Sequence, residues 1–265
     1  MAPILPSSFV ECAVRLPLAA LLPLALSASA AEPRLVELVD KANKALRGDS
    51  SHGRLIMTIE TPEWKRSLEV EGWNKDRNFA FIVIRSPAKE RGNTTLRRRT
   101  EMWAWLPKVE RVIKIPPTMM HNTWQGSDFT YEDIVKADSI TKDYTYKLLK
   151  TTKEADRTIY HIEALPKPDA PVVWGKVLTD VALYDSDQAV IALNELDYSE
   201  RGELIRTITL SDIKMLGGRR VPTRLECVPA KKKGQRTILQ YLELEFDFAI
   251  DESFFSYQRL QKGGR

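Results

Sequence analysis

Cysteine and histidine are scarce in this sequence, which excludes a disulfide framework and the usual zinc sites. There are two cysteines, Cys12 and Cys227, among 265 residues. Cys12 lies in an N-terminal segment that we expect to be removed, so no internal disulfide remains in the mature chain. The three histidines, His52, His121 and His161, lack a partner ligand at metal-binding spacing. We expect no metal, no cofactor, and a fold held by its hydrophobic core.

Catalytic motifs are also missing. No glycine-rich phosphate loop occurs, and the run Gly126, Ser127, Asp128 lacks the second glycine of a nucleophile elbow. Glu132 and Asp133 are adjacent, so on a helix their side chains point about 100° apart. We therefore expect no catalytic residues and a protein that is not an enzyme. Ser127 or Asp128 is instead predicted to cap the short helix that follows.

The longest apolar run, Leu16–Leu26, has 11 residues and is shorter than the roughly 18–20 needed to span a bilayer. Arg15 precedes it, and the small residues Ala28-Ser29-Ala30 follow it. This is the pattern of a signal peptide cleaved after Ala30. We therefore predict a cleaved signal peptide over residues 1–30, a single mature domain over 31–265, and a periplasmic location.

Charge of either sign is not concentrated enough to indicate nucleic-acid binding. The net charge is +4, and no basic face is interleaved with stacking aromatics. Two basic runs occur, Arg97–Arg99 within an expected strand and Lys231–Lys233 beside Gly234. They are typical either of contacts with anionic lipid head groups or of a solvated strand and turn.

Hydrophobic periodicity predicts one helix followed by many strands. Apolar residues recur at three- and four-residue steps in Pro33–Arg47, with Gly48 placed for a C-terminal cap. The period then changes to two. The expected strands are Leu55–Ile59, Leu68–Glu71, Phe79–Ile84, Met102–Leu106, Val109–Ile115, Thr145–Thr151, Thr158–Leu165, Lys176–Tyr184, Val190–Tyr198, Leu204–Leu210, Val221–Val228 and Thr237–Phe246.

Short connections between so many strands predict an antiparallel meander, because parallel pairs need long helical crossovers. A sheet of this size tends to curl or to close. We therefore expect a mainly β (α+β) protein. Its single large antiparallel sheet would form a half-open β-barrel with a few helices plugging the concave face.

The segment Pro116–Asp138 interrupts the strand rhythm with apolar and aromatic residues. Long structured loops often carry function, so it is either a mobile lid on a cavity or a loop packed permanently on the core. As a lid, it would cover a bound acyl chain, with Gly126 as a hinge. The lid hypothesis predicts that Trp124→Ala weakens lipid retention and leaves the fold nearly as stable.

Both faces of the expected strand Met102–Leu106 are apolar, so we expect both to be buried. Trp103 and Trp105 occupy one face, and Met102 and Leu106 the other. Either a covering helix buries the second face, or one face lines a ligand cavity. Flexible methionines would suit such a wall. The predicted cavity and lid residues are Met102, Trp103, Trp105, Leu106, Met119, Met120, Trp124 and Phe129.

The residues from Met102 to Pro117, followed by Trp124–Asp133, resemble the signature of the outer-membrane lipoprotein-sorting protein family. These are LolA-like periplasmic proteins that include the treponemal lipoprotein domain group. Further matching segments are Val172–Lys176, Ser211–Lys214, Gly217–Arg219, Val221–Thr223, Phe246-Asp247 and Phe254. The resemblance covers roughly Leu35 to Leu260. One departure is Gln125, where relatives often carry methionine.

The resemblance implies a half-open β-barrel whose hydrophobic cavity accepts the acyl chains of a lipid or a lipoprotein for transfer toward the outer membrane. It also implies a membrane permease of the resistance-nodulation-division type as a partner. Two alternatives remain, a cargo-free accessory subunit of an envelope permease complex and, more weakly, an envelope hydrolase. The carrier needs an open apolar cavity, whereas the accessory subunit would bury its tryptophans in a closed core.

Overall fold

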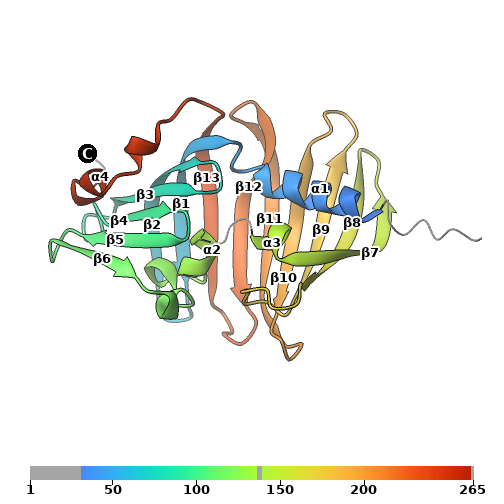
Figure 1. Ribbon diagram of the computed structural model, residues 1–265, viewed down its shortest axis with the longest axis horizontal. Helices are drawn as coiled ribbons and strands as arrows, with labels where there is room; N and C mark the ends of the chain where they lie inside the picture. Colours follow the sequence, from blue (N-terminus) through green and yellow to red (C-terminus); the bar gives the residue numbers. More distant parts are fainter. Residues whose placement is uncertain (1–30, 136–138, 264–265) are drawn as a thin grey trace, which may run out of the picture.

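The computed structural model describes residues 31–135 and 139–263, and the expected signal peptide lies outside the described residues. Four α-helices are present in the described chain: α1 (Ala31–Lys44), α2 (Tyr131–Val135), α3 (Ser139–Lys142) and α4 (Tyr257–Gln261). Short 3-10 helices cover Pro117–Met119, Trp124–Gly126 and Glu252–Phe254. All the helices are short or peripheral, so the sheet dominates the molecule (Figure 1).

Most of the strands alternate in sequence between apolar and polar positions, as half-buried strands do. In chain order they are β1 (Ser50–Glu60), β2 (Lys65–Lys75), β3 (Phe79–Ser86), β4 (Thr94–Arg98), β5 (Glu101–Leu106), β6 (Arg111–Ile115), β7 (Tyr144–Lys153), β8 (Arg157–Pro166), β9 (Lys176–Tyr184), β10 (Val190–Tyr198), β11 (Leu204–Leu216), β12 (Arg219–Pro229) and β13 (Arg236–Phe246).

These strands form one 13-stranded sheet in the order β6-β5-β4-β3-β2-β1-β13-β12-β11-β10-β9-β8-β7. Every neighbouring pair is antiparallel, including β1 with β13, where Gly53 is the Cα partner of Leu244. The two edge strands, β6 and β7, follow one another in the chain. The segment that joins them, with α2 and α3, must therefore cross from one edge to the other (Figure 1).

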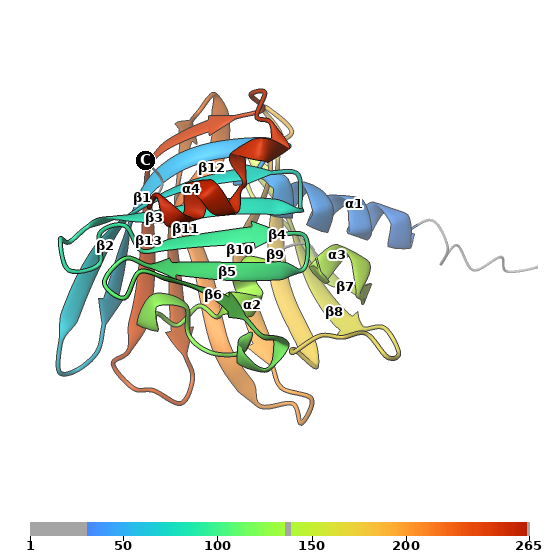
Figure 2. The same cartoon turned by 60° about the vertical axis from the view of Figure 1, so that its left-hand side comes forward.

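Helices cover the two faces of the sheet at different places. We call the face that carries α1 the inner face. Helix α1 packs across β7, β9 and β10 on one half of the sheet, and α4 packs against β4, β5 and β6 on the other (Figure 2). The sheet is open and strongly curved, as expected from its length and twist. The predicted fold class is confirmed.

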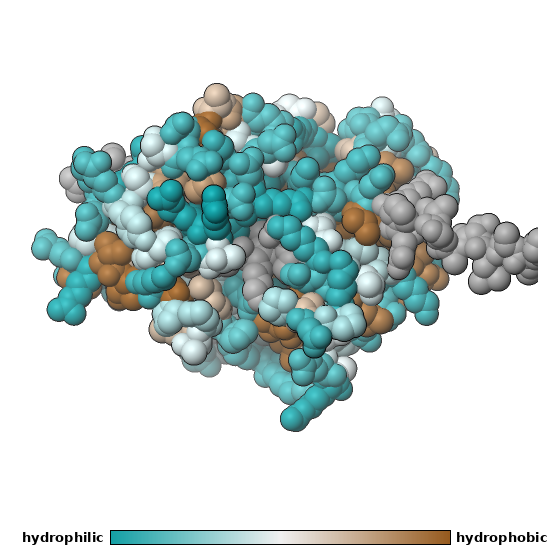
Figure 3. Space-filling view, in the orientation of Figure 1, coloured by the Kyte–Doolittle hydropathy of each residue, from teal (hydrophilic) through white to brown (hydrophobic). Residues whose placement is uncertain are grey.

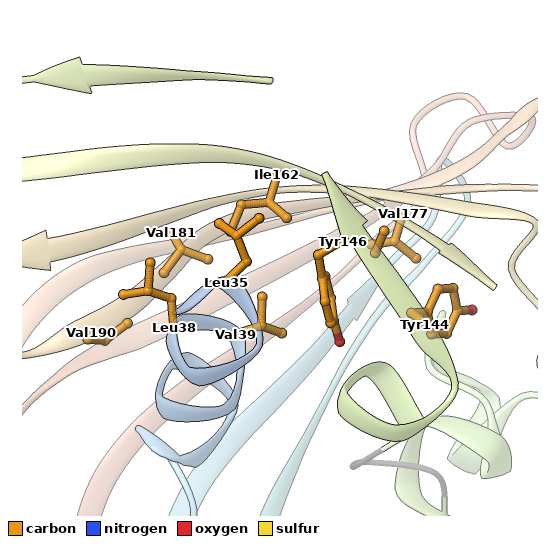
Figure 4. Close-up of a cluster of buried hydrophobic side chains, with 10 residues drawn as sticks. Leu35, Leu38, Val39, Tyr144, Tyr146, Ile162, Val177, Val181 and Val190 are labelled. Carbon is orange, nitrogen blue, oxygen red and sulfur yellow. The ribbon is translucent and has the colours of Figure 1, made fainter. Parts of the chain in front are cut away.

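The amphipathic face of α1 is buried as its periodicity predicts. Leu35, Leu38 and Val39 point from α1 toward Val181 on β9 and Tyr146 on β7 (Figure 4). Gly48 then adopts a φ of 57°, and its N–H donates to the carbonyl of Lys44 at 2.9 Å. The turn that follows α1 therefore closes at the predicted glycine.

An aromatic cluster occupies the outer face of the other half. Trp73, Phe81 and Trp103 alternate with residues of the inner face on β2, β3 and β5, and they pack with Phe254 and Phe255 from the C-terminal segment. The ring centroids of Trp73 and Phe254 are 5.4 Å apart. Side chains of the C-terminal segment thus cover this aromatic cluster on the outer face.

The visible surface is mainly hydrophilic with separate apolar patches (Figure 3). Exposed apolar residues include Val109, Ile113 and Met119 near the β5–β6 edge, and Leu148 and Leu149 on the edge strand β7. Within the described chain, none of the helices has the length and hydropathy required to span a bilayer.

Candidate ligand cavity

A cavity of about 410 Å³ lies on the inner face, between the sheet, α1 and the link from β6 to β7. This volume falls within the range typical of small-molecule sites. Apolar side chains from most of the strands form much of its wall. They include Leu55, Val70, Ile82, Val181, Ile208, Leu225 and Leu239.

A pair of glycines leaves room at the floor of this cavity. Gly53 on β1 and Gly72 on β2 are cross-strand partners, and both line the cavity. A Cβ atom at Gly53 would lie 2.7 Å from Leu244 Cδ2, which is too close. A Cβ atom at Gly72 would have its nearest neighbour, Ile82 Cγ1, at 3.9 Å. Position 72 therefore tolerates a side chain that would extend into the cavity.

Helix α1 closes one side of the cavity. Its residues Val39, Ala42 and Asn43 line the space, followed by Leu46 and Arg47 in the turn after the helix. Because Val39 also belongs to the core cluster beneath the helix, the packing of α1 fixes the position of this wall. The amphipathic pattern found in the sequence therefore positions one side of the cavity.

A charged group interrupts the apolar wall, and two of its four residues, Arg206 and Asp197, are buried. We call it the Arg206 cluster: Arg206, Asp133, Asp197 and Glu195. Arg206 donates from Nε to Asp197 Oδ2 at 2.6 Å, and from Nη1 and Nη2 to the two carboxylate oxygens of Asp133 at 2.7 Å each. The ring of Trp174 lies 4.7 Å from the guanidinium. The arginine thus joins α2 to β10 and β11.

Burial controls the protonation of this cluster. Burial raises the pKa of Glu195 well above its ordinary value of 4.5, and the charge of Asp197 raises it further. Burial also raises the pKa of Asp197, although Arg206 partly offsets this. At Asp133 burial opposes ionisation, but the hydrogen bonds and charge of Arg206 outweigh it and lower the pKa. Of the three carboxyl groups, that of Glu195 is therefore the one whose protonated form is most favoured.

The Glu195→Gln variant is expected to become more stable than the wild type as the pH rises. Below the ordinary pKa of 4.5, Glu195 is protonated in both the folded and the unfolded chain. Above it, ionisation stabilises the unfolded chain, so native stability is lost until the pH passes the raised folded pKa. Glutamine removes this loss. Urea unfolding should show that the stability difference between the variant and the wild type grows in favour of the variant as the pH rises from about 4 to about 8. A difference that is constant with pH would contradict the assignment.

The link between β6 and β7 packs on the inner face. Trp124 and Phe129 line the cavity, and Trp124 is 5% exposed, with its indole Nε1 donating to Thr95 Oγ1 at 3.2 Å. Arg66 Nη2 donates to the carbonyl oxygen of Gln125 at 2.5 Å. Gln125 has a φ of 53°. In this conformation the segment is a packed loop that forms part of the cavity wall.

Ser127 and Asp128 fasten this loop and do not cap α2. Ser127 Oγ donates to the carbonyl oxygen of Trp124 at 2.7 Å. Asp128 accepts from Thr237 Oγ1 at 2.7 Å, which ties the loop to β13. The cap of α2 is Thr130, whose Oγ1 accepts from the N–H of Asp133 at 3.2 Å. Gly126, with a φ of 71°, lies in the turn just before Ser127.

Four of the other residues predicted for the cavity lie on β5. Met102 is fully buried on the inner face, where Met120 and Ile134 of the β6–β7 link cover it. Trp103 is 6% exposed on the outer face, where the ring of Tyr257 lies 4.8 Å from its own. The β5 residues Met102, Trp103, Trp105 and Leu106 are not among those that line the cavity.

The β5 residues do not reach the cavity because other segments of the chain already pack on both faces of the strand. The β6–β7 link covers the inner face, and the C-terminal segment covers the outer face with Trp105 packed against the aromatic cluster. Met119 and Met120 belong to the same link: Met119 is exposed and Met120 is half-buried, and neither lines the cavity. Of the eight predicted cavity and lid residues, Trp124 and Phe129 reach the cavity.

Sequence reasoning missed the Arg206 cluster, although a signal was present. Glu195 and Asp197 sit two residues apart in a strand whose other residues, apart from Asn194, are apolar or aromatic, so both point to the same face. Arg206 is the cross-strand partner of Asp197. An acid at two successive inward positions opposite an arginine indicates a buried ionic group. Among the described residues, no three histidine, cysteine, aspartate or glutamate side chains are grouped so as to hold a metal ion.

The chain matches one protein-family model and is similar in fold to several solved structures. A protein-family model described as an uncharacterized protein matches residues 76–262. No curated protein matches the chain. A DUF1329 family protein from Desulfovibrio piger is 18% identical, with a TM-score of 0.73 over 86% of this chain and 98% of that one.

Two further solved structures are similar. A LolA superfamily protein from Nitrosomonas europaea is 22% identical, with a TM-score of 0.68 over 84% of this chain and 98% of that one. A domain named for outer membrane lipoprotein sorting, from Vibrio parahaemolyticus, is 19% identical, with a TM-score of 0.69 over 85% of this chain and 97% of that one. At these identities the likeness establishes the fold.

Proposed function

The chain belongs to the family that the matching model describes and has the LolA-like fold, and on this premise we propose that its cavity binds the acyl chains of a lipid or a lipoprotein. The observation that carries the proposal is the apolar space of about 410 Å³ on the inner face. Burial of an acyl chain contributes about 0.8 kcal/mol per methylene, so a cavity of this kind gives affinity without a covalent step.

A carrier role also accounts for the sequence at the N-terminus. A protein cleaved after Ala30 would work in the periplasm, where an acyl chain needs a protein cover to cross water. We propose that the mature chain, residues 31–265, transfers its cargo toward the outer membrane, with a resistance-nodulation-division type permease as the membrane partner. The cargo-free accessory subunit is the second candidate, and the cavity favours the carrier over it.

The Gly72→Phe variant is expected to lose acyl-chain binding and to keep its fold. A Cβ atom at position 72 has its nearest neighbour at 3.9 Å, and a phenyl ring there would occupy the space that several methylenes of a bound chain would fill. Excluding two or three methylenes should weaken binding at least about tenfold. Native mass spectrometry of protein purified from the periplasm should detect lipid on the wild type and little on the variant.

Gly72→Ala is the matched control, because it adds the Cβ atom alone. Its lipid occupancy should equal that of the wild type, and circular dichroism should give the same fold for all three proteins. Wild-type protein that carries no lipid, and binds no acyl chain when one is supplied, would contradict the carrier and favour the accessory subunit.

A further inference from the structure

The charged part of the cavity wall would select among ligand head groups, an inference that rests on the proposed binding of acyl chains. We infer that the Arg206 cluster recognises a ligand head group that presents hydrogen-bond donors, above all an ammonium, and disfavours an anionic one. Glu195 is the specificity-determining residue. It lines the cavity together with Asp133 and Arg206, so a head group beside the acyl chain would meet this cluster.

The guanidinium of Arg206 is already committed. Its Nε donates to Asp197, while Nη1 and Nη2 donate to both oxygens of Asp133. Trp174 lies against it at 4.7 Å. The two carboxylates thus more than balance the one cation, and a third carboxyl group, that of Glu195, adjoins them. An anionic head group would meet more negative than positive charge here.

A buried carboxylate oxygen of Asp197 indicates that Glu195 is protonated. Asp197 is 0% exposed, and its Oδ1 has no donor from a nitrogen or a hydroxyl of the described residues. Glu195 stands two residues from Asp197 on β10, so the two carboxyl groups lie on the same face of the strand. A buried acceptor is costly unless a donor reaches it, so the Glu195 proton satisfies Asp197. The other carboxyl oxygen of Glu195 then remains as an acceptor on the cavity wall.

A donor on the ligand fits this acceptor. A hydroxyl group would donate to neutral Glu195. An ammonium group would do more, because it can replace the shared proton, which leaves to water, and pair with the ionised Glu195. Hydrogen bonds that involve a charged group are stronger than neutral ones. Affinity should therefore decrease from the amine to the alcohol and then to the carboxylate.

Three amphiphiles that share one chain test this order: dodecylamine, dodecanol and dodecanoate. Each is titrated below its micelle concentration, near neutral pH, against wild-type protein loaded with the fluorescent apolar probe N-phenylnaphthylamine, and displacement is measured. Dodecylamine should bind about tenfold more tightly than dodecanoate. Glu195→Gln should bring the affinity for dodecylamine to that for dodecanol and leave the dodecanol affinity unchanged.

Glu203→Gln is the matched control, since it makes the same substitution at an exposed ion pair with Lys231, outside the cavity lining. It should keep the wild-type order. If all three amphiphiles displace the probe equally, acyl-chain binding stands and the inference about the head group fails. Tightest binding of dodecanoate would also overturn it and would assign the head-group site to Arg206 or to Arg47, the other arginine of the lining. If none displaces the probe, the proposed function itself fails.

Discussion

Replacing Arg206 by methionine should destabilise the fold by about 3–5 kcal/mol, because it removes the cation from a buried group of carboxylates. The side chain of Arg206 is 5% exposed and that of Asp197 0% exposed. Without the guanidinium, Asp133 and Asp197 would lose three hydrogen bonds. Urea unfolding near neutral pH, where Asp133 is ionised in the wild type, measures the loss.

The chain offers a matched control in Arg236, which also bridges two carboxylates, those of Glu60 and Glu226. Its side chain is 45% exposed, so Arg236→Met should cost less than about 1 kcal/mol. Adding Asp197→Asn to Arg206→Met should recover part of the stability, because it removes a stranded charge. A loss at Arg206 no larger than at Arg236 would mean that water reaches the cluster freely.

The local structure could be predicted from the sequence because it depends on near neighbours. Two-residue alternation predicts a strand at Thr237–Phe246, and β13 covers Arg236–Phe246. A three- to four-residue period predicts a helix over Pro33–Arg47, and α1 covers Ala31–Lys44. The pairing of β1 with β13 could not be predicted in the same way, because it joins segments that are nearly two hundred residues apart in the chain.

The candidate site was harder to predict, because it forms only when the strands pair. The composition of β5 indicates that Met102 and Trp103 need burial, and both are buried. It does not indicate what covers them, since a cavity and a packed segment demand the same apolar side chains. The Arg206 cluster likewise joins residues from α2, β10 and β11, and each of its charges alone resembles an ordinary surface charge.

The Trp124→Ala variant should lose about 3–5 kcal/mol of stability, as expected for a large aromatic side chain removed from a core. This expectation differs from the near-neutral effect that the lid hypothesis predicts from the sequence. Trp124 is 5% exposed and packs with Met57, Leu68 and Ile84 of the inner core. Its indole also donates to Thr95 at 3.2 Å, so truncation leaves a void and an unpaired hydroxyl.

Thermal and urea unfolding of Trp124→Ala, measured beside Trp64→Ala, separates the two hypotheses. Trp64 is 47% exposed in the β1–β2 turn, so its truncation should change stability by no more than about 0.5 kcal/mol. If Trp124→Ala matches this control and yet releases bound lipid, the segment is a mobile lid and the packed conformation is one of its two states. If Trp124→Ala is severely destabilised, the loop is permanent core. An acyl chain bound as proposed would then have to enter by another route, past α1, which lines the other side of the cavity.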